Sequence, residues 1–381
     1  ESPSLFIEGS RNVARPFEVV PSILGYYRFR PPLGASTVTE VLGDSNRLRM
    51  LLVAGLGELE LSNWEIGNTP IENFDDYTME VRSGTVLDSP LTLYTNQTKQ
   101  DEFSIALTQV TGWQQRTSDL NADELSVDLT FPRGIVNFDT SGNRTPRTVV
   151  LEVEYRKVGD VPWLSIPAGF TSTLGVSAVS GSTVTITGAK SVAVRHGIRW
   201  KTPTRGQYEV QVRRTTSDTT STRIFDLSYW ATLRTITDED PIQFSLPLAK
   251  AALDIRATDQ INGLLEELSV LAKSVVPDWD TGSGTWVSRV SNNPASLFRH
   301  ILQGPGKATP VPDSEIDITQ LQTWHEFCVT NGFTFNMVRD FNASVTDTLA
   351  DIASAGRAGL DSVDGKWSVV IDQPMSITST H

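Results

Sequence analysis

The sequence predicts a multidomain protein that is mainly β, with an α+β part at its C-terminal end. Its 381 residues exceed what one hydrophobic core usually serves, so two to three domains are expected. Short runs that alternate polar and apolar residues recur through the first 240 positions, and this is the period of a half-buried strand. After Pro241 the pattern changes to helical spacing interrupted by strand signals.

Residues 1–124 are predicted to form a first β domain. Its strand signals are separated by short turns and lie at 48–53, 58–61, 64–66 and 78–82. The cluster Gly67-Asn68-Thr69-Pro70 has the composition of a turn. Short strands at this spacing predict a barrel or a sandwich rather than parallel strands joined by helices.

Residues 125–240 are predicted to form an inserted β-sandwich. Strand signals recur between Ser/Thr/Gly-rich connections, at 125–131, 149–156, 183–186, 207–214 and 225–230. In the fourth of these runs Tyr208, Val210 and Val212 share one face, and charged or amide groups occupy the other. Several short strands without a helix signal match a two-sheet fold of the immunoglobulin or fibronectin kind.

Residues 241–381 are predicted to form an α+β domain, and its first helix is expected over 261–275. Thr258 or Asp259 would cap this helix and Pro277 would end it. Its apolar residues recur at the spacing of one helical face: Ile261, Leu264, Leu265, Leu268, Leu271, Ala272 and Val275.

Three shorter helices are expected further on. They begin at the capping residues Asn293, Asp317 and Ser344, and a glycine stops each of them, at 304, 332 and 356. Strands are expected at 252–257, 333–338 and 367–371. Asp364-Gly365 is a type I′ turn signal that joins 360–363 to the last strand in a hairpin.

Charge and composition exclude several classes of protein. The net charge is −13, and both 1–240 (29 acids, 23 bases) and 241–381 (16 acids, 9 bases) are acidic, which argues against a protein that coats nucleic acid. One cysteine and four histidines exclude an intramolecular disulfide and the usual zinc set, so no metal or cofactor is expected. No apolar run could span a bilayer, and Glu1-Ser2-Pro3 does not open a signal peptide. The missing initiator Met indicates a processed chain or a piece of a longer one.

No residues form a recognisable catalytic motif, so no catalytic residue is assigned and the protein is not expected to be an enzyme. Nucleophile-elbow, phosphate-loop and His-Glu-x-x-His motifs are absent from the sequence. His196, His300 and His325 each stand alone, and core positions are the simplest reading of Cys328 and of the tryptophans at 64, 230, 324 and 367.

Three acidic groups are candidates for a glycosidase-type pair, because such enzymes use two carboxylates roughly 5–10 Å apart. The first two are Asp75-Asp76, whose side chains would point to opposite faces of a strand, and Asp238-Glu239-Asp240. Asp278 and Asp280, two residues apart around Trp279, can face one way. They are expected in a Pro/Gly-rich loop, where acids usually cap turns.

One ordered set of motifs begins at Val338-Arg339-Asp340-Phe341 and runs through the helix that ends in Arg357-Ala358-Gly359, then across the hairpin to Asp372-Gln373-Pro374. It resembles the tip attachment (host specificity) proteins J of long-tailed phages and the related baseplate hub proteins, and this is the strongest likeness in the chain. Weaker likenesses lie at Asn293-Pro294-Ala295, at 321–324, and at 59–71 near the start.

The resemblance implies a structural subunit of the virion at the tail tip. It implies β-barrel-like hub domains, assembly as a homotrimer that closes the tail tube, and contacts with tail tube, distal tail and tape-measure proteins. The hub would open for DNA ejection without binding the DNA, which suits an acidic lumen. Host receptor contact is expected through segments outside this chain. The alternative is a carbohydrate-binding or glycan-degrading tail tip protein, and a β-sandwich adhesin is a third possibility.

Overall fold

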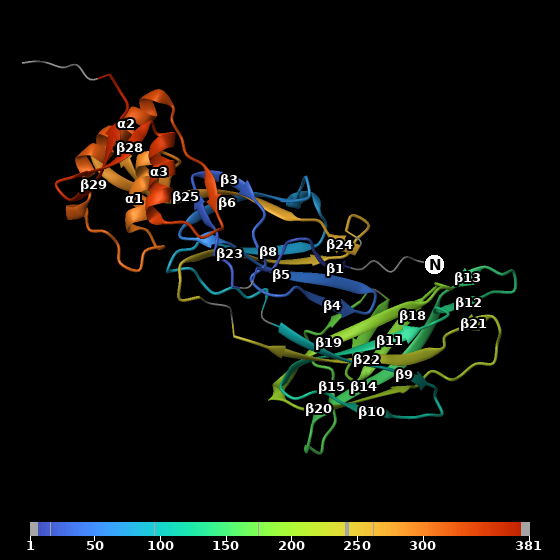
Figure 1. Ribbon diagram of the computed structural model, residues 1–381. Helices are drawn as coiled ribbons and strands as arrows, with labels where there is room; N and C mark the ends of the chain where they lie inside the picture. Colours follow the sequence, from blue (N-terminus) through green and yellow to red (C-terminus); the bar gives the residue numbers. More distant parts are fainter. Residues whose placement is uncertain are drawn as a thin grey trace, which may run out of the picture.

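The computed structural model describes residues 7–15, 17–94, 96–173, 175–240, 244–261 and 263–374. The described chain forms a central β body, a β-sandwich on one side of it and a three-helix part on the other (Figure 1). Strands dominate in the body and the sandwich, so the prediction of a mainly β chain with an α+β C-terminal part is confirmed. No helix among the described residues is long and apolar enough to span a membrane.

The body is built from segments that are far apart in the sequence, which lie before and after the sandwich. One sheet has the order β4-β5-β23-β8, and the other has the order β26-β25-β6-β7, with β3 also paired to β25. Two small pairs, β1-β24 and β2-β27, add further links between the first and last segments. Its elements are β1 (Ile7–Ser10), β2 (Ser22–Leu24), β3 (Tyr26–Phe29), β4 (Val38–Leu42), β5 (Ser45–Leu56), β6 (Leu59–Ile66), β7 (Thr69–Pro70), η1 (Ile71–Asn73), β8 (Tyr77–Arg82), β23 (Leu248–Arg256), β24 (Gly263–Leu265), β25 (Leu268–Asp280), β26 (Thr285–Val290) and β27 (Met337–Arg339).

The two body sheets pack face to face around a common core. Met50 and Leu253 are cross-strand partners on β5 and β23, and they contribute to that core together with Trp64 of β6 and Val270 of β25. All four side chains are buried. The sheets of the described residues remain open, and no closed barrel is present among them, so the barrel-like hub domains are not confirmed.

The helix expected over 261–275 is wrong, because β24 (263–265) and the first part of β25 (from 268) lie in this range. Leu268, Val270 and Ala272 are buried at every second position, which is the period of a strand. The long strand finds hydrogen-bonding partners in β6 and β3, far away in the sequence. Pro277, expected to end the helix, lies inside β25 opposite Ser288.

The sandwich consists of two packed sheets. Their orders are β16-β19-β11-β22-β9 and β10-β20-β14-β18-β17, with β15 paired to β14. A separate small sheet, β13-β12-β21, lies at one end. The strands are β9 (Asn96–Leu107), β10 (Gln114–Thr117), β11 (Ala122–Phe131), β12 (Val136–Phe138), β13 (Arg144–Thr145), β14 (Arg147–Lys157), β15 (Leu164–Ser165), β16 (Thr171–Ser172), β17 (Val176–Ser180), β18 (Thr183–Gly188), β19 (Val194–Gly206), β20 (Tyr208–Arg214), β21 (Ile224–Phe225) and β22 (Ser228–Asp238).

The N-terminal boundary of the predicted sandwich falls elsewhere in the structure, while its C-terminal boundary at 240 lies close to the end of β22. Strands β9 and β10, assigned from sequence to the first domain, pair with β22 and β20 of the sandwich, and position 125 lies inside β11. Strand β23, assigned to the third domain, pairs with β5 and β8 of the body. The sandwich is therefore inserted between two neighbouring strands of one body sheet.

The C-terminal part packs three helices and a hairpin around one core. Its elements are α1 (Pro294–Gln303), η2 (Asp313–Glu315), α2 (Ile318–Asn331), α3 (Val345–Ala355), β28 (Ala358–Val363) and β29 (Lys366–Ile371). The side chains of Asn293, Asp317 and Ser344 accept the capping hydrogen bonds as predicted. Asp364 and Gly365 have φ of 50° and 75° in the predicted hairpin turn. The strand expected at 333–338 is shorter and begins at Met337.

Candidate functional site

The distal end of the sandwich is the end that points away from the three-helix part (Figure 1). It comprises the segment after β9 (108–113), the connection from β11 to β14 (132–146) and the connection from β20 to β22 (215–227). The small sheet β13-β12-β21 belongs to it. Loops at the end of a rigid sandwich are common places for binding residues, because the scaffold fixes them.

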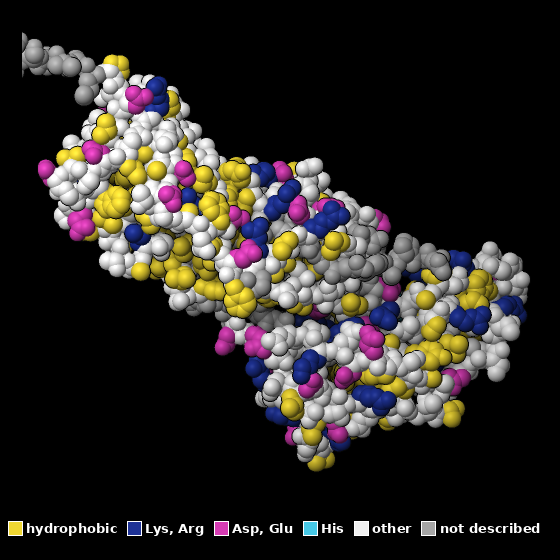
Figure 2. Space-filling model, in the orientation of Figure 1, with side chains coloured by type: hydrophobic (Ala, Val, Ile, Leu, Met, Phe, Trp, Pro, Cys, Tyr) yellow, Lys and Arg dark blue, Asp and Glu magenta, His cyan; other side chains and the backbone are white. Residues whose placement is uncertain are grey.

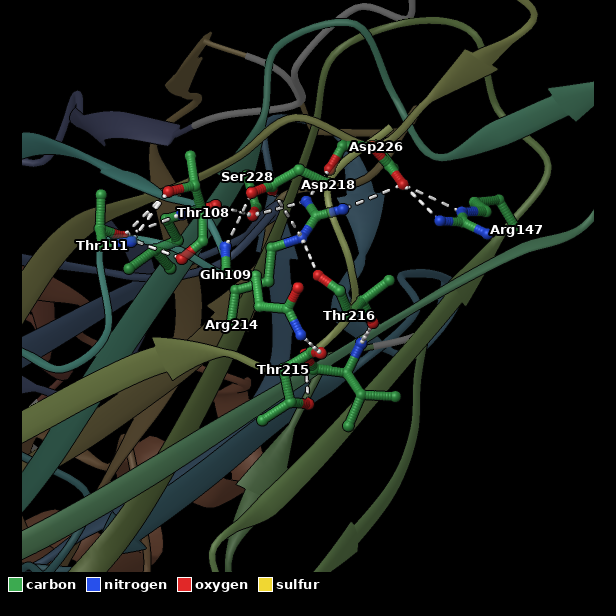
Figure 3. Close-up of polar contacts among 12 residues, drawn as sticks. Thr108, Gln109, Thr111, Arg147, Arg214, Thr215, Thr216, Asp218, Asp226 and Ser228 are labelled. Atoms are coloured by element: carbon green, nitrogen blue, oxygen red, sulfur yellow. Dashed lines mark hydrogen bonds and ion pairs between the residues drawn. The ribbon is translucent and has the colours of Figure 1, made fainter. Parts of the chain in front are cut away.

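A buried arginine anchors the connection from β20 to β22 (Figure 3). Arg214, at the end of β20, has a side chain only 2% exposed, and its guanidinium lies 3.0 Å from the Asp226 carboxylate. It also donates to the carbonyl of Thr216 at 2.9 Å and to the Ser228 hydroxyl at 3.1 Å. Arg147 donates to the same Asp226 oxygen at 2.8 and 3.0 Å. Both ends of the 215–227 loop are therefore fixed by charge-assisted hydrogen bonds.

Two phenylalanines and an arginine pack on the small sheet. Phe138 and Phe225 meet edge to face with ring centroids 5.4 Å apart, and the Arg133 guanidinium lies 4.2 Å from the centre of the Phe225 ring. Arg144 pairs with Phe138 across the strands, and the Phe138 amide donates to the carbonyl of Arg223. The sheet thus holds aromatic and basic side chains beside one another.

The sandwich is joined to the body through the turn of the β4–β5 hairpin. The backbone N–H of Gly43 donates to the buried Asp128 carboxylate at 3.1 Å, and the Asp44 carboxylate accepts from the backbone N–H of Arg195 at 3.1 and 3.2 Å. Gly43 has φ of 58°, a conformation that favours glycine. Gly197 of β19 lies directly against this turn. The orientation of the sandwich on the body is therefore fixed by backbone contact.

We expect Gly197→Ala to separate the sandwich from the body. A Cβ at 197 would lie 2.6 Å from Leu42 Cδ1 and 2.7 Å from the Gly43 amide nitrogen, so the hairpin turn has to withdraw. The expected cost is about 1–3 kcal/mol. Small-angle scattering should give a larger radius of gyration, and protease should cut the connections to the sandwich faster. Gly359→Ala is the control, because nothing lies within 4 Å of its Cβ position. An unchanged radius for Gly197→Ala would contradict the rigid joint.

Ion pairs continue this joint beside a cavity of about 770 Å³. Arg199 of the sandwich pairs with Glu124 of its own sheet and with Glu40 of β4. Glu40 also pairs with Arg49, which reaches Asp254 of β23 at 3.1 Å. The charges lining the cavity are thus largely engaged with one another, and they bind the sandwich to the body.

Asp278 is the centre of a buried polar cluster and does not lie in the loop that the sequence suggested, because it belongs to β25. Its Oδ1 accepts from Ser291 and Ser296 at 2.6 Å and from His325 Nε2 at 3.0 Å, and its Oδ2 accepts from Arg289 at 2.7 Å. Burial alone raises the pKa of Asp278, but hydrogen bonds from His325 and the other donors outweigh it and hold the pKa well below its usual range.

The cluster does not have the arrangement of a hydrolase site. Both serines donate to Asp278 rather than to His325, so neither serine is paired with a base. Asp280, the second carboxylate of the candidate pair, binds Ser283 and lies 3.8 Å from Arg289 near the surface. The contacts instead tie β25 to the start of α1 and to α2.

Acidification should weaken the wild-type protein more than Asp278→Asn. The lowered pKa means that the charged Asp278 stabilises the fold above the usual carboxyl pKa of about 4, and this contribution is lost as the pH falls below it. The asparagine has no such contribution, so its stability is lower at neutral pH and changes less from about pH 5 to 2. Thermal unfolding at several pH values checks this. Parallel pH curves would show that Asp278 contributes no proton-linked stability.

The remaining sequence candidates are scattered over the fold. Asp76 pairs with Arg47 and Arg256, while the neighbouring Asp75 is exposed. Asp238 ends β22, and burial, then Glu124 and Asp123, raise its pKa. Burial raises the pKa of Cys328 to about 12, which fits the predicted core position. His196 lies in β19 and His300 in α1, and the described residues hold no group of three side chains suited to a metal ion.

Sequence reasoning missed Arg214, although a signal was present. Arg214 follows Val210 and Val212 at the same period-two register, so it occupies the core face of its strand. A charged residue on a core face requires a buried partner, which here is Asp226. The sequence around Gly43 and Gly197 contains no such pattern, because their contact joins two segments that are distant in the sequence.

A comparison with known protein families found a match that covers the sandwich. Residues 97–239 match the family model described as the FNIII-A domain of tip attachment protein J. This segment runs from β9 to β22 and so coincides with the sandwich of the structure, and it begins well before the boundary at 125 that the sequence suggested. No curated protein matches the chain. Residues 97–239 are therefore similar to a domain of tip attachment protein J, and this match, together with the motifs in the first and last segments, supports a phage tail tip attachment protein, a component of the virion at the tail tip.

Proposed function

We propose that this protein is a hub subunit of a long-tailed phage, which closes the tail tube, links it to the receptor-binding tip and opens for DNA ejection. Three copies would form the hub as a homotrimer and contact tail tube, distal tail and tape-measure proteins. The proposal rests on the family match of the sandwich and on the motifs in 338–374 and 59–71 that resemble hub proteins.

The observation that favours a mechanical role is the way the strands of the body are connected. Its sheets combine strands from the first 82 residues with β23 and β25, and the sandwich is held to it by the Gly43–Asp128 contact and by ion pairs. A unit whose first and last segments share sheets cannot extend by pulling one segment away without breaking many hydrogen bonds at once. Such a unit is suited to hold neighbouring proteins in fixed positions.

The charge distribution is compatible with a passage for DNA. The segment 97–239 carries 15 acidic and 16 basic residues, whereas the rest of the chain carries 30 acidic and 16 basic residues. The negative charge excess therefore belongs to the body and the C-terminal part. Like charge along a passage keeps DNA from adhering to its wall.

Electron cryomicroscopy of purified phage particles tests the proposal. The body is expected on the tail axis, in three symmetry-related copies between the tube and the tip, with acidic side chains facing the passage. A position off the axis, or a protein found only as a free monomer, would overturn it.

The glycan-degrading alternative has no supporting geometry among the described residues. It needs two carboxylates on opposite sides of a bound sugar. Asp278 is saturated by four donors, and Asp280 faces Ser283 and Arg289. Sugar binding without cleavage does not need such a pair of carboxylates, and the distal end of the sandwich is the place to look for it.

A further inference from the structure

The distal end of the sandwich carries basic side chains that have no acidic partner. Arg133, Arg144, Lys190 and Arg223 are all exposed, and none forms an ion pair in the described structure. They come from different connections: β11 to β12, β13 itself, β18 to β19, and the segment before β21. Figure 2 shows Lys and Arg side chains gathered at this end, with few acidic ones beside them.

The sheet register places the three arginines of this set around one aromatic pair. Arg144 is the cross-strand partner of Phe138, so the two side chains share a face of the small sheet. The carbonyl of Arg223 accepts from the Phe138 amide on the other side. Arg133 lies over the Phe225 ring, so three arginines are placed around Phe138 and Phe225. Lys190, which is bridged to Ile135, lines the cavity at the joint with the body instead.

Nearby acids form no ion pair with the cluster in the described structure. Asp139 accepts hydrogen bonds from the backbone of Ser141 and from Asn143 within its own turn. Asp226 is buried between Arg147 and Arg214. No acidic residue occurs from Val161 to Tyr208, the stretch that contains Lys190. In a chain of net charge −13, this concentration of unpaired positive charge is a local exception.

We propose that this cationic and aromatic cluster binds an anionic polysaccharide, through its phosphate or carboxylate groups. Guanidinium groups form paired hydrogen bonds with both kinds of anion, and the three cations of the cluster are arginines. The loops that carry them are rich in hydroxyl and amide side chains, at 140–145 and 215–222, which suit sugar hydroxyls. The partly exposed Phe138 and Phe225 rings offer an apolar surface to the sugar ring.

The same features disfavour nucleic acid as the ligand. Proteins that hold DNA by its backbone usually contact about 6–10 phosphates, and this requires a longer basic stripe than three side chains on one domain end. A polysaccharide needs only a few anionic groups at one site. The tail tip position of the protein brings the cluster to where surface polysaccharides of a cell are met.

Binding of the full chain to defined polymers tests the inference. The probes are a phosphomannan, polygalacturonate, neutral dextran and a short DNA duplex, each measured by biolayer interferometry at near-physiological salt. Arg144→Ser/Arg223→Ser is the test variant. Lys201→Ser/Arg205→Ser removes the same charge from the opposite end of β19 and serves as the control. Thermal unfolding of each variant verifies that the fold is retained.

The wild type is expected to bind one or both anionic polysaccharides but not dextran. The test variant should bind about tenfold more weakly, which corresponds to about 1.4 kcal/mol, and the control should bind like the wild type. Preference for phosphomannan assigns phosphate, and preference for polygalacturonate assigns carboxylate. Equal losses in both variants, no binding beyond that of dextran, or equally tight binding of the DNA duplex would each overturn the inference. These readouts do not depend on the hub role.

Discussion

Asp128→Ala is expected to destabilise the sandwich by about 3–5 kcal/mol, because it leaves a buried charge without its partner. Asp128 is fully buried on β11, and its Oδ2 accepts from Arg234 of β22 at 2.8 Å. The Arg234 side chain is only 1% exposed, so water cannot replace the lost carboxylate. The variant also loses the acceptor of the Gly43 amide, which weakens the joint to the body. Urea unfolding measures the change.

Two further variants make this prediction specific. Glu209→Ala breaks the partly exposed pair with Arg156 and is expected to cost about 1 kcal/mol or less. Asp128→Ala/Arg234→Met removes both buried charges and should recover much of the stability lost in the single variant. If Asp128→Ala costs no more than Glu209→Ala, the buried pair is not the source of stability.

Arg214→Met should destabilise the distal end by about 3 kcal/mol, the second largest effect expected. The methionine keeps the apolar contacts of the side chain but leaves Asp226 with Arg147 alone, and the hydrogen bonds to Thr216 and Ser228 are lost. Urea unfolding gives the free energy, and amide hydrogen exchange should rise over 215–227. Polysaccharide binding should fall as well, because Arg223 and Phe225 lose their fixed positions.

Arg223→Ser is the matched control for that variant. It changes an exposed arginine of the same loop, so its stability is expected to stay within about 0.5 kcal/mol of the wild type. Hydrogen exchange over 215–227 should be unchanged. Comparable losses of stability in the two variants would show that Arg214 is not the anchor of the loop.

The elements that the sequence predicted correctly are those specified by local chemistry. The three helices of the C-terminal part have a side-chain cap at the start and a glycine just after the end, and the hairpin turn needs positive φ at Asp364 and Gly365. Strands such as β14 and β20 alternate strictly between faces. Such signals do not depend on distant segments.

The errors arise where distant segments decide the structure. Residues 261–275 fit a helical face and a buried strand equally well, and the availability of β6 and β3 as partners selects the strand. β9 begins with the polar run Asn96 to Glu102, so its sequence does not indicate that it belongs to the sandwich. β9 can be polar because it is an edge strand, which needs no apolar outer face. The sequence could not show that Asp278 meets His325 for the same reason.

The insertion of the sandwich between β8 and β23 also determines the order in which a growing chain can fold. Arg82 and Lys250 are direct partners in adjacent strands, yet the whole sandwich separates them in the sequence. The sandwich contains all of its own strands and can fold while the ribosome is still making the rest. β4, β5 and β8 must wait for β23 before their sheet is complete. By closing that long loop into a compact unit, early folding of the sandwich lowers the entropy cost of bringing β8 and β23 together.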